Sequence, residues 1–307
     1  MRHSANIFLA GAFAALLVGA SGAAGAAVPP AQRDNAAGQA AAVAVQKDLR
    51  LAAAVPAPIS KRGTLVVGAQ MQQPPEDFYA ADGRTPIGFE VDLADALARV
   101  LGLKVEYRTM AFDALIPALA SGRVDMTMSA MNDTKPREKT ISFADYFNAG
   151  ITMLAQKGNP DHISGPDSLC GQAVSVEAGT TQQMFAEQQS ARCKAAGKKP
   201  VSIVIGSSTE QQEESLRTGR FAVVLDDTPT AIYTAQVAGD GKLFQAVEYP
   251  PINGGPYGIG VAKGDPALLS VIQKAMQKLI DDGVYAKILG AWDMTAGAIP
   301  KATINAG

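Results

Sequence analysis

The 307-residue sequence has few of the residue types on which most metal and nucleophilic sites depend. It contains two histidines, two cysteines and one tryptophan. His3 lies in an N-terminal segment typical of export, so a Ser-His-Asp triad or a histidine metal site would depend on His162 alone, in the polar loop 158–165. The sequence also lacks a P-loop and a nucleotide-binding glycine fingerprint. These absences argue against an enzyme with such a site, and we expect no cofactor and no metal.

The sequence has no surplus of positive charge, with 27 Lys and Arg against 29 Asp and Glu. This balance gives no electrostatic footprint for nucleic acid. Long apolar runs are absent except in residues 1–26, where Arg2 and His3 precede the apolar stretch 7–18 and a small-residue site follows at 24–26. This pattern predicts a cleaved secretory signal peptide, and hence a soluble, monomeric protein of the periplasm.

The two cysteines are Cys170 and Cys193. In an exported chain an isolated pair is more often a disulfide than a metal or redox site, and the C-x-x-C spacing of a redox motif is missing. We therefore predict a structural disulfide.

Residues 27–60 are rich in Ala and Pro, which predicts a disordered linker, with a short helix at 36–54 as the alternative. Order should begin near Gly63. Apolar periodicity then predicts alternating strands and helices, namely strands at 64–68, 104–108 and 125–129 and helices at 89–101 and 113–120. A second run of the same kind starts after Gly150, and a strand and two helices follow Tyr257. Such alternation predicts an α/β fold whose ligands bind at the carboxyl ends of the strands.

Six motifs occur in a fixed order along the chain: GFEVDLA (88–94), FDALIPAL (112–119), SGRVD (121–125), DTKPR (133–137), GTTQ (179–182) and DTP (227–229). Together they resemble the polar amino-acid-binding proteins of ABC importers, which are solute-binding proteins of family 3 with the type II periplasmic binding-protein fold. The resemblance extends from about residue 61 to residue 304.

The resemblance implies two lobes, each a β-sheet flanked by helices, with a ligand cleft between them. Lobe one would comprise residues 61–148 and 256–304, and lobe two residues 149–255. It further implies capture of a small amino acid or derivative by hinge closure, and membrane permease subunits of an ABC importer as partners.

By this resemblance, Arg137 should clamp the ligand carboxylate, because a guanidinium can form two parallel charge-assisted hydrogen bonds. Asp227 should pair with the ligand ammonium from the opposite lobe, with Asp226 as the adjacent candidate. The structural alternatives are a solvated surface arginine and an acid that caps the helix at Pro229.

Thr180 and Thr181 precede a helix whose N-terminal N–H groups should point into the cleft, although a threonine there can simply cap the helix. Ser129 and Asn132 match family positions that bind the main-chain groups of the amino acid, where the family usually has Ser or Thr in place of Asn132. Phe112 matches an aromatic residue that packs on the ligand side chain, and it would fit equally well in the core.

The sequence departs from the family near residue 70. Relatives that bind basic amino acids carry an acid shortly after the glycine of the first strand, and many members carry an aromatic residue before the Pro-rich turn. This chain has Gln70 and Gln73 there, so Gln73 becomes the expected contact, and the resemblance carries no preference for a cationic side chain. Possible substitutes lie close by in the sequence: Glu76, Asp77, Phe78 and Tyr79.

An enzyme on the same fold is the alternative function, because periplasmic cyclohexadienyl dehydratases resemble these binding proteins. Such an enzyme would need an acid with a raised pKa beside the leaving hydroxyl, with Glu177, Asp227 and Glu90 as the candidates. A third possibility, an extracellular sensor module, has no signalling domain in this chain to support it.

Overall fold

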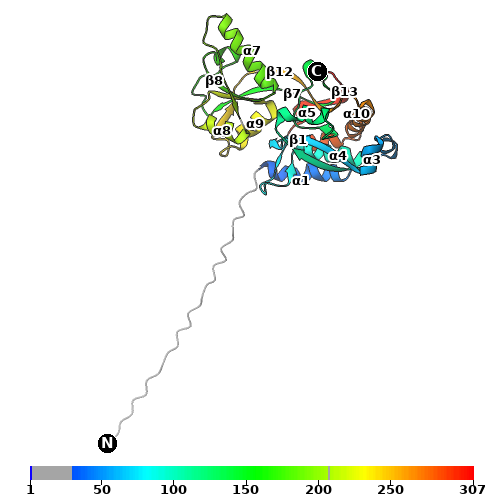
Figure 1. Cartoon of the computed structure of the whole chain (residues 1–307). Coiled ribbons are helices and arrows are strands. Elements are labelled where there is room, and N and C mark those ends of the chain that lie inside the picture. Colours follow the sequence, from blue (N-terminus) through cyan, green and yellow to red (C-terminus); the bar gives the residue numbers. More distant parts are fainter. Residues whose placement is uncertain (2–29, 207) are drawn as a thin grey trace.

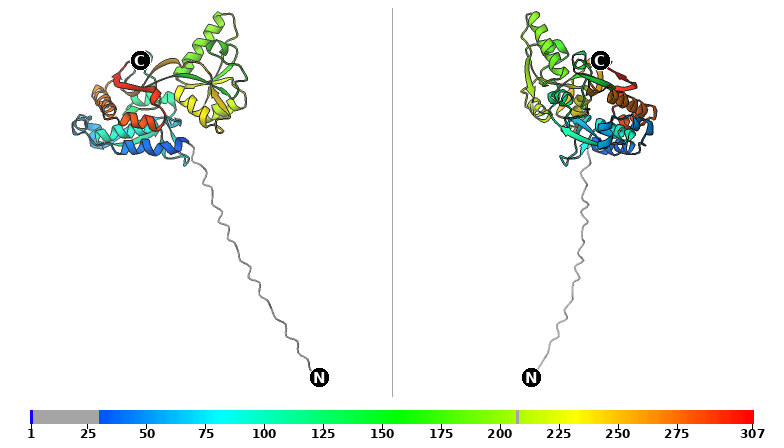
Figure 2. Two further views of the ribbon diagram at one scale, coloured as in Figure 1. Left: turned by 180° about the vertical axis from the view of Figure 1, so that it is seen from behind. Right: turned by 45° about the vertical axis from the view of Figure 1, so that its right-hand side comes forward.

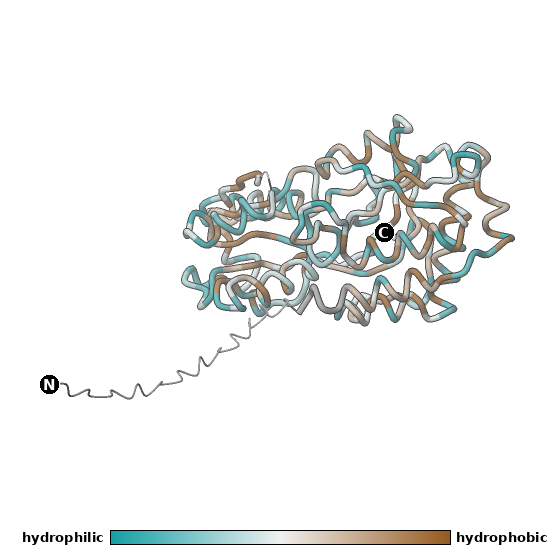
Figure 3. The backbone as a smooth tube through the Cα atoms, turned by 90° about the horizontal axis from the view of Figure 1, so that it is seen from below, coloured by the Kyte–Doolittle hydropathy of each residue, from teal (hydrophilic) through white to brown (hydrophobic). Residues whose placement is uncertain are grey.

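The computed structural model describes residue 1 and residues 30–206 and 208–307. Apart from its first residue, the predicted signal peptide therefore lies outside the described residues. Among the described residues, no helix is long and apolar enough to cross a membrane. Figure 3 shows that apolar stretches alternate with polar ones along this part of the chain.

The described chain forms two lobes (Figure 1), and Figure 2 shows the same division from behind. We call residues 30–148 with 256–307 lobe 1, and residues 149–255 lobe 2. The largest buried apolar cluster lies in lobe 1, whereas a separate cluster between Ile151 and Val247 lies in lobe 2. Each lobe thus has a core of its own.

The sheet of lobe 1 runs in the order β5-β1-β6-β12-β7. β1 (Thr64–Ala69) pairs in parallel with β5 (Lys104–Thr109) and with β6 (Met126–Thr127). α4 (Phe89–Leu101) packs its apolar face on this core and ends at Gly102, whose φ of 68° is a conformation that glycine adopts without strain. The other elements of lobe 1 are β2 (Gln72–Gln73), β3 (Asp77–Tyr79), β4 (Pro86–Ile87), α5 (Leu115–Ala120), α6 (Lys135–Glu138), α10 (Pro266–Asp281), α11 (Val284–Ala291) and β13 (Ala298–Ile304).

The sequence left open which lobe the C-terminal helices join. α10 and α11 bury Leu268, Ile272 and Ile288 in the same cluster as Leu65 and Val67 of β1. The C-terminal segment therefore completes lobe 1.

Lobe 2 continues the strand order with β7, β10, β8 and β9. Its strands are β8 (Ala173–Glu177), β9 (Ser202–Gly206), β10 (Val223–Asp227) and β11 (Phe244–Ala246), and its helices are α7 (Thr181–Ala195), α8 (Thr209–Arg217) and α9 (Thr228–Val237). The predicted disulfide is confirmed: Cys170 and Cys193 are bonded, with their Cα atoms 5.5 Å apart, and join the loop before β8 to α7.

Two long antiparallel strands connect the lobes. β7 (Ile141–Gln156) and β12 (Ile252–Ala262) pair along both lobes, with irregularities in the register between Ile252 and Gly255 and between Tyr257 and Gly258. A two-stranded connection with local breaks in its ladder offers little resistance to bending.

The expectation of a disordered linker at 27–60 is wrong for residues 30–60. These residues form α1 (Pro30–Val43), α2 (Leu49–Ala53) and most of α3 (Ala57–Arg62). Leu51, Val55 and Ile59 are buried in the lobe 1 core. Pro58 does not prevent a helix here because it occupies the first turn of α3, where a missing N–H costs no helical hydrogen bond.

Candidate ligand-binding site

Arg137 lies on the short helix α6, which begins after the cap residue Thr134. Its side chain is 8% exposed and donates hydrogen bonds to two backbone carbonyls, Asn132 O at 2.7 Å and Gly179 O at 3.0 Å. The first belongs to lobe 1 and the second to lobe 2. The guanidinium also lies 5.2 Å from the centre of the Phe112 ring. Burial lowers the pKa of Arg137 to about 10, so the group stays charged at neutral pH.

Asp227 lies at the end of β10 and at the start of α9, in lobe 2. The residue is 4% exposed, and its Oδ1 atom has no hydrogen-bond partner among the described residues. Burial raises the pKa of Asp227 to about 7, while Tyr257, Gln182 and the charge of Arg137 act in the opposite direction. The two predicted charges thus come from opposite lobes and influence each other. The adjacent candidate, Asp226, accepts the backbone N–H of Asp227 through its Oδ1 at 2.8 Å.

The lobes are in direct contact around these charges. Thr181 donates its hydroxyl to Asn132 Oδ1 at 3.0 Å, and Thr230 of lobe 2 donates to Glu76 Oε2 of lobe 1 at 3.0 Å. A pocket of about 370 Å³ opens beside Asn132 and Thr181 and is lined from both lobes, although neither Arg137 nor Asp227 lines it. The interface between the lobes therefore carries polar groups suited to a small polar ligand.

Residues 65–295 match the profile of the bacterial extracellular solute-binding proteins, family 3. The chain belongs to this family. An arginine-binding protein of Corynebacterium glutamicum is 29% identical to this solute-binding protein over 254 residues, which is 82% of each chain. The lysine/arginine/ornithine-binding periplasmic protein of Escherichia coli is 30% identical over 66% of this chain and 77% of its own.

Solved structures place the solute-binding protein in the same fold. An ancestral arginine-binding protein bound to arginine is 34% identical, with a TM-score of 0.69 over 75% of this chain and 98% of its own. An ancestral amino acid-binding protein, described as a precursor of cyclohexadienyl dehydratase, is 32% identical, with a TM-score of 0.68 over 76% of this chain and 97% of its own. The expected family and the type II periplasmic binding-protein fold are confirmed.

Three of the expected site hydroxyls are already engaged in this solute-binding protein, namely that of Thr181, which donates to Asn132 Oδ1, and those of Thr180 and Ser129. Thr180 caps α7, accepting from Gln183 N at 3.1 Å and donating to Glu177 O at 2.7 Å, so its only hydroxyl proton is used. Ser129 accepts from Gln70 N at 2.9 Å and donates to Asp77 Oδ2 at 2.8 Å. In this structure the proton of each hydroxyl is thus donated to a protein oxygen, and the ligand contacts expected of Thr180 and Ser129 stay predictions.

Phe112 and Gln73 have different surroundings. Phe112 is buried in an apolar cluster with Val66 and Leu115. Its ring therefore packs in the core and also lies against the guanidinium of Arg137. Gln73 lies in β2, paired with Asp77 of β3. Its side chain is buried and forms no hydrogen bond with a described residue.

The sequence did not predict that several acids are buried close to one another between the lobes. Glu76 is fully buried, and burial together with the charges of Asp227 and Glu90 raises its pKa well above the usual range. The backbone of Glu76 packs closely against Gly88, because a Cβ at residue 88 would lie 1.9 Å from the backbone carbonyl oxygen of Glu76. Glu90 accepts from the Tyr146 hydroxyl and from Ala130 N at 2.9 Å. No local pattern signals this group, because its members meet only in the folded chain.

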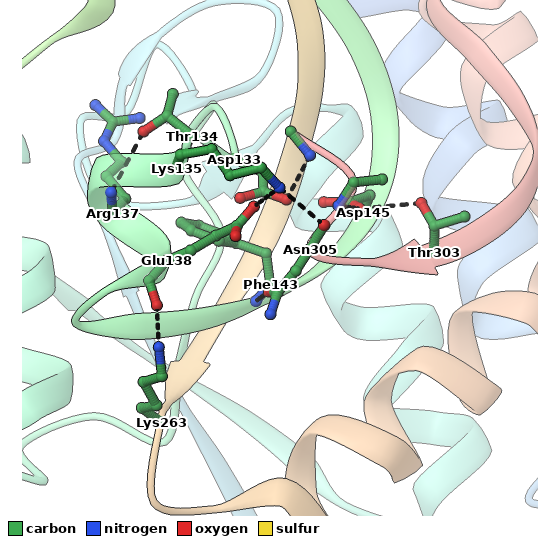
Figure 4. A network of polar contacts seen from close by, with 12 residues as sticks. Asp133, Thr134, Lys135, Arg137, Glu138, Phe143, Asp145, Lys263, Thr303 and Asn305 are labelled. Atoms are coloured by element: carbon green, nitrogen blue, oxygen red, sulfur yellow. Dashed lines mark hydrogen bonds and ion pairs between the residues drawn. The ribbon is translucent and has the colours of Figure 1, made fainter.

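The C-terminal residues support the segment that carries Arg137 (Figure 4). Asp145 of β7 accepts from the Thr303 hydroxyl at 3.0 Å and from Ala306 N at 3.1 Å, and Asp133 accepts from Gly307 N at 3.0 Å. Residues 303–307 thus anchor β7 and the turn that leads into α6.

Proposed function

We propose that this protein binds an amino acid or a close derivative as a zwitterion and delivers it to the membrane subunits of an ABC importer. The observation that carries the proposal is the pair Arg137 and Asp227, two buried groups of opposite charge contributed by opposite lobes. The ligand carboxylate binds the guanidinium, and the ligand ammonium binds the Asp227 carboxylate.

Several further contacts fit this arrangement. Only two of the five guanidinium N–H donors are needed for the carbonyls of Asn132 and Gly179, which leaves donors for a carboxylate. Thr181 stands at the first residue of α7, where the helix dipole favours an anion. The unpartnered Oδ1 of Asp227 supplies an acceptor for the ammonium.

Affinity in this proposal depends on lobe closure. A ligand held by both charges links lobe 1 to lobe 2, and β7 with β12 provides the flexible connection. In this proposal the protein is exported to the periplasm through a cleaved signal peptide. The closed form, with its ligand, then docks on the permease. The relatives named for binding arginine, cystine and histidine support an amino acid as the ligand.

Thermal-shift screening followed by calorimetry against the twenty amino acids and common derivatives tests the proposal. We expect at least one amino acid to raise the unfolding temperature and to bind with a stoichiometry of one. Absence of binding to every compound in the set would contradict the proposal.

A dehydratase is the second candidate function. The observation that favours it is that burial raises the pKa of both Glu177 and Asp227 to about 7, which suits a group that exchanges a proton near neutral pH. Turnover of prephenate or arogenate would decide in favour of the enzyme, and binding of an amino acid without turnover would decide against it.

A further inference from the structure

Gln70 of lobe 1 and Glu177 of lobe 2 are in direct contact between the lobes, with Gln70 Nε2 donating to Glu177 Oε1. Gln70 directly follows β1, and its backbone N–H is fixed by Ser129 Oγ at 2.9 Å and Asp77 Oδ2 at 3.1 Å. Its side chain is 3% exposed, and Gln70 Oε1 has no hydrogen-bond partner among the described residues. A buried amide oxygen without a donor is costly unless a ligand supplies one.

Glu177 ends β8, three residues before the cap of α7. It is therefore part of the turn whose Gly179 carbonyl accepts from Arg137. Burial raises the pKa of Glu177, and the nearby Asp113 raises it further. Among the described residues no Lys or Arg forms an ion pair with Glu177. Its carboxylate therefore lacks a compensating positive charge.

The other buried charged groups between the lobes favour a cation as well. Among the described residues, Arg137 is the one buried cation, whereas buried acids come from both lobes: Glu76, Asp77, Glu90 and Asp227. Burial raises the pKa of each of these acids, so they carry less negative charge at neutral pH than their number suggests. A ligand with a second positive charge would favour their ionised forms.

We propose that Glu177 and Gln70 form a side-chain subsite that selects an amino acid with a cationic end group. The proposal rests on the proposed function, since Arg137 and Asp227 hold the other end of the same ligand. A guanidinium suits this subsite because it is planar and carries only donors. It can donate to the Glu177 carboxylate from one side and to Gln70 Oε1 from the other, in place of the direct contact between them.

This subsite also explains why residue 70 is a glutamine, where relatives that bind basic amino acids carry an acid nearby. Lobe 1 offers a neutral amide there, and the acid that compensates the cation comes from lobe 2. Because the acid and the amide lie on opposite lobes, the end group of the ligand contributes to closure as well as to affinity.

Calorimetry with four probes tests the subsite: L-arginine, L-lysine, L-citrulline and L-glutamine. Citrulline has nearly the shape of arginine without its charge. We expect arginine to bind at least about tenfold more tightly than citrulline, since a hydrogen bond to a charged group is stronger than a neutral one. In Glu177→Gln we expect arginine to lose about tenfold or more in affinity, whereas citrulline changes by less than about threefold.

Glu248→Gln is the matched control, because Glu248 is exposed on lobe 2 and forms no hydrogen bond or ion pair with a described residue. It should leave all four affinities unchanged. Citrulline or glutamine binding as tightly as arginine to the unaltered protein would overturn the subsite without affecting the amino-acid proposal, and this comparison needs no variant. Absence of binding to all twenty amino acids and to their common derivatives would overturn both.

Discussion

Replacing Arg137 with alanine is expected to remove most of the ligand affinity and to leave the fold intact. Arg137 is 8% exposed, and the hydrogen bonds of its guanidinium to Asn132 O and Gly179 O hold the group at the contact between the lobes. In the proposed complex it also binds the ligand carboxylate. Alanine therefore leaves one buried charge of the ligand without a partner.

The magnitude follows from that loss. Truncating one partner of a buried charge pair costs about 2–5 kcal/mol, which corresponds to a loss of affinity between about 30-fold and about 4,000-fold. Arg137→Lys keeps the charge but loses the planar fork, so a smaller loss is expected. Without ligand, the free energy of unfolding should change by less than about 2 kcal/mol, because the desolvated guanidinium has no ion-pair partner among the described residues.

Calorimetry at pH 7.5 with the ligand found by screening measures the affinity, and thermal unfolding without ligand checks the fold. Arg123→Ala serves as the control, since Arg123 is an exposed arginine of lobe 1 that contacts Ser121. Unchanged affinity in Arg137→Ala would refute the carboxylate clamp.

Three further predictions concern pH, the disulfide and the C-terminus. Affinity should rise from pH 5 to pH 8, by up to about tenfold per unit below pH 7, because the ammonium binds ionised Asp227, whose pKa in the free protein is about 7. Replacing both Cys170 and Cys193 with serine should lower the free energy of unfolding by about 3 kcal/mol in urea denaturation. Deleting residues 303–307 should lower it by about 2 kcal/mol or more, because the buried carboxylate of Asp145 loses two donors.

Each of these predictions has a control and a contradicting result. A flat pH profile would mean that Asp227 does not titrate on binding, and Asp227→Asn should make the profile less steep, leaving the part that Glu177 contributes. Equal stability with and without reductant in the unaltered protein would contradict the role of the disulfide. Equal unfolding temperatures of the full and shortened chains would show that residues 303–307 contribute nothing to lobe 1.

The local elements of the core were predictable because each follows from its own residues. The strand expected at 64–68 is β1 (Thr64–Ala69), and the helix expected at 89–101 is α4 with the same bounds. Long-range pairing was harder to foresee. β7 begins at Ile141 rather than at 151, because its first half is stabilised by pairing with β12 and β13, which come more than 100 residues later.

The candidate site also combines residues that the sequence predicted with contacts that depend on the fold. Arg137 and Asp227 were predicted from the resemblance that the motifs carry, whereas the hydrogen bonds of Thr180 and Ser129 depend on neighbours that only the fold supplies. At residues 30–60 the sequence predicted a disordered linker, whereas the structure has helices. Their composition lacks a strong apolar period, and their helices are stabilised by packing on the core of lobe 1.

The sequence by itself determined the family, the alternation of strands and helices, the disulfide pair and the two charges proposed for the zwitterion, because each of these is written in short stretches or in their order. Only the tertiary structure decided which acids gather in the cleft and which amide faces Glu177. Gln70 and Glu177 are 107 residues apart. No periodicity encodes such a contact, since it arises where the ends of β1 and β8, two strands of different lobes, come together in the folded chain.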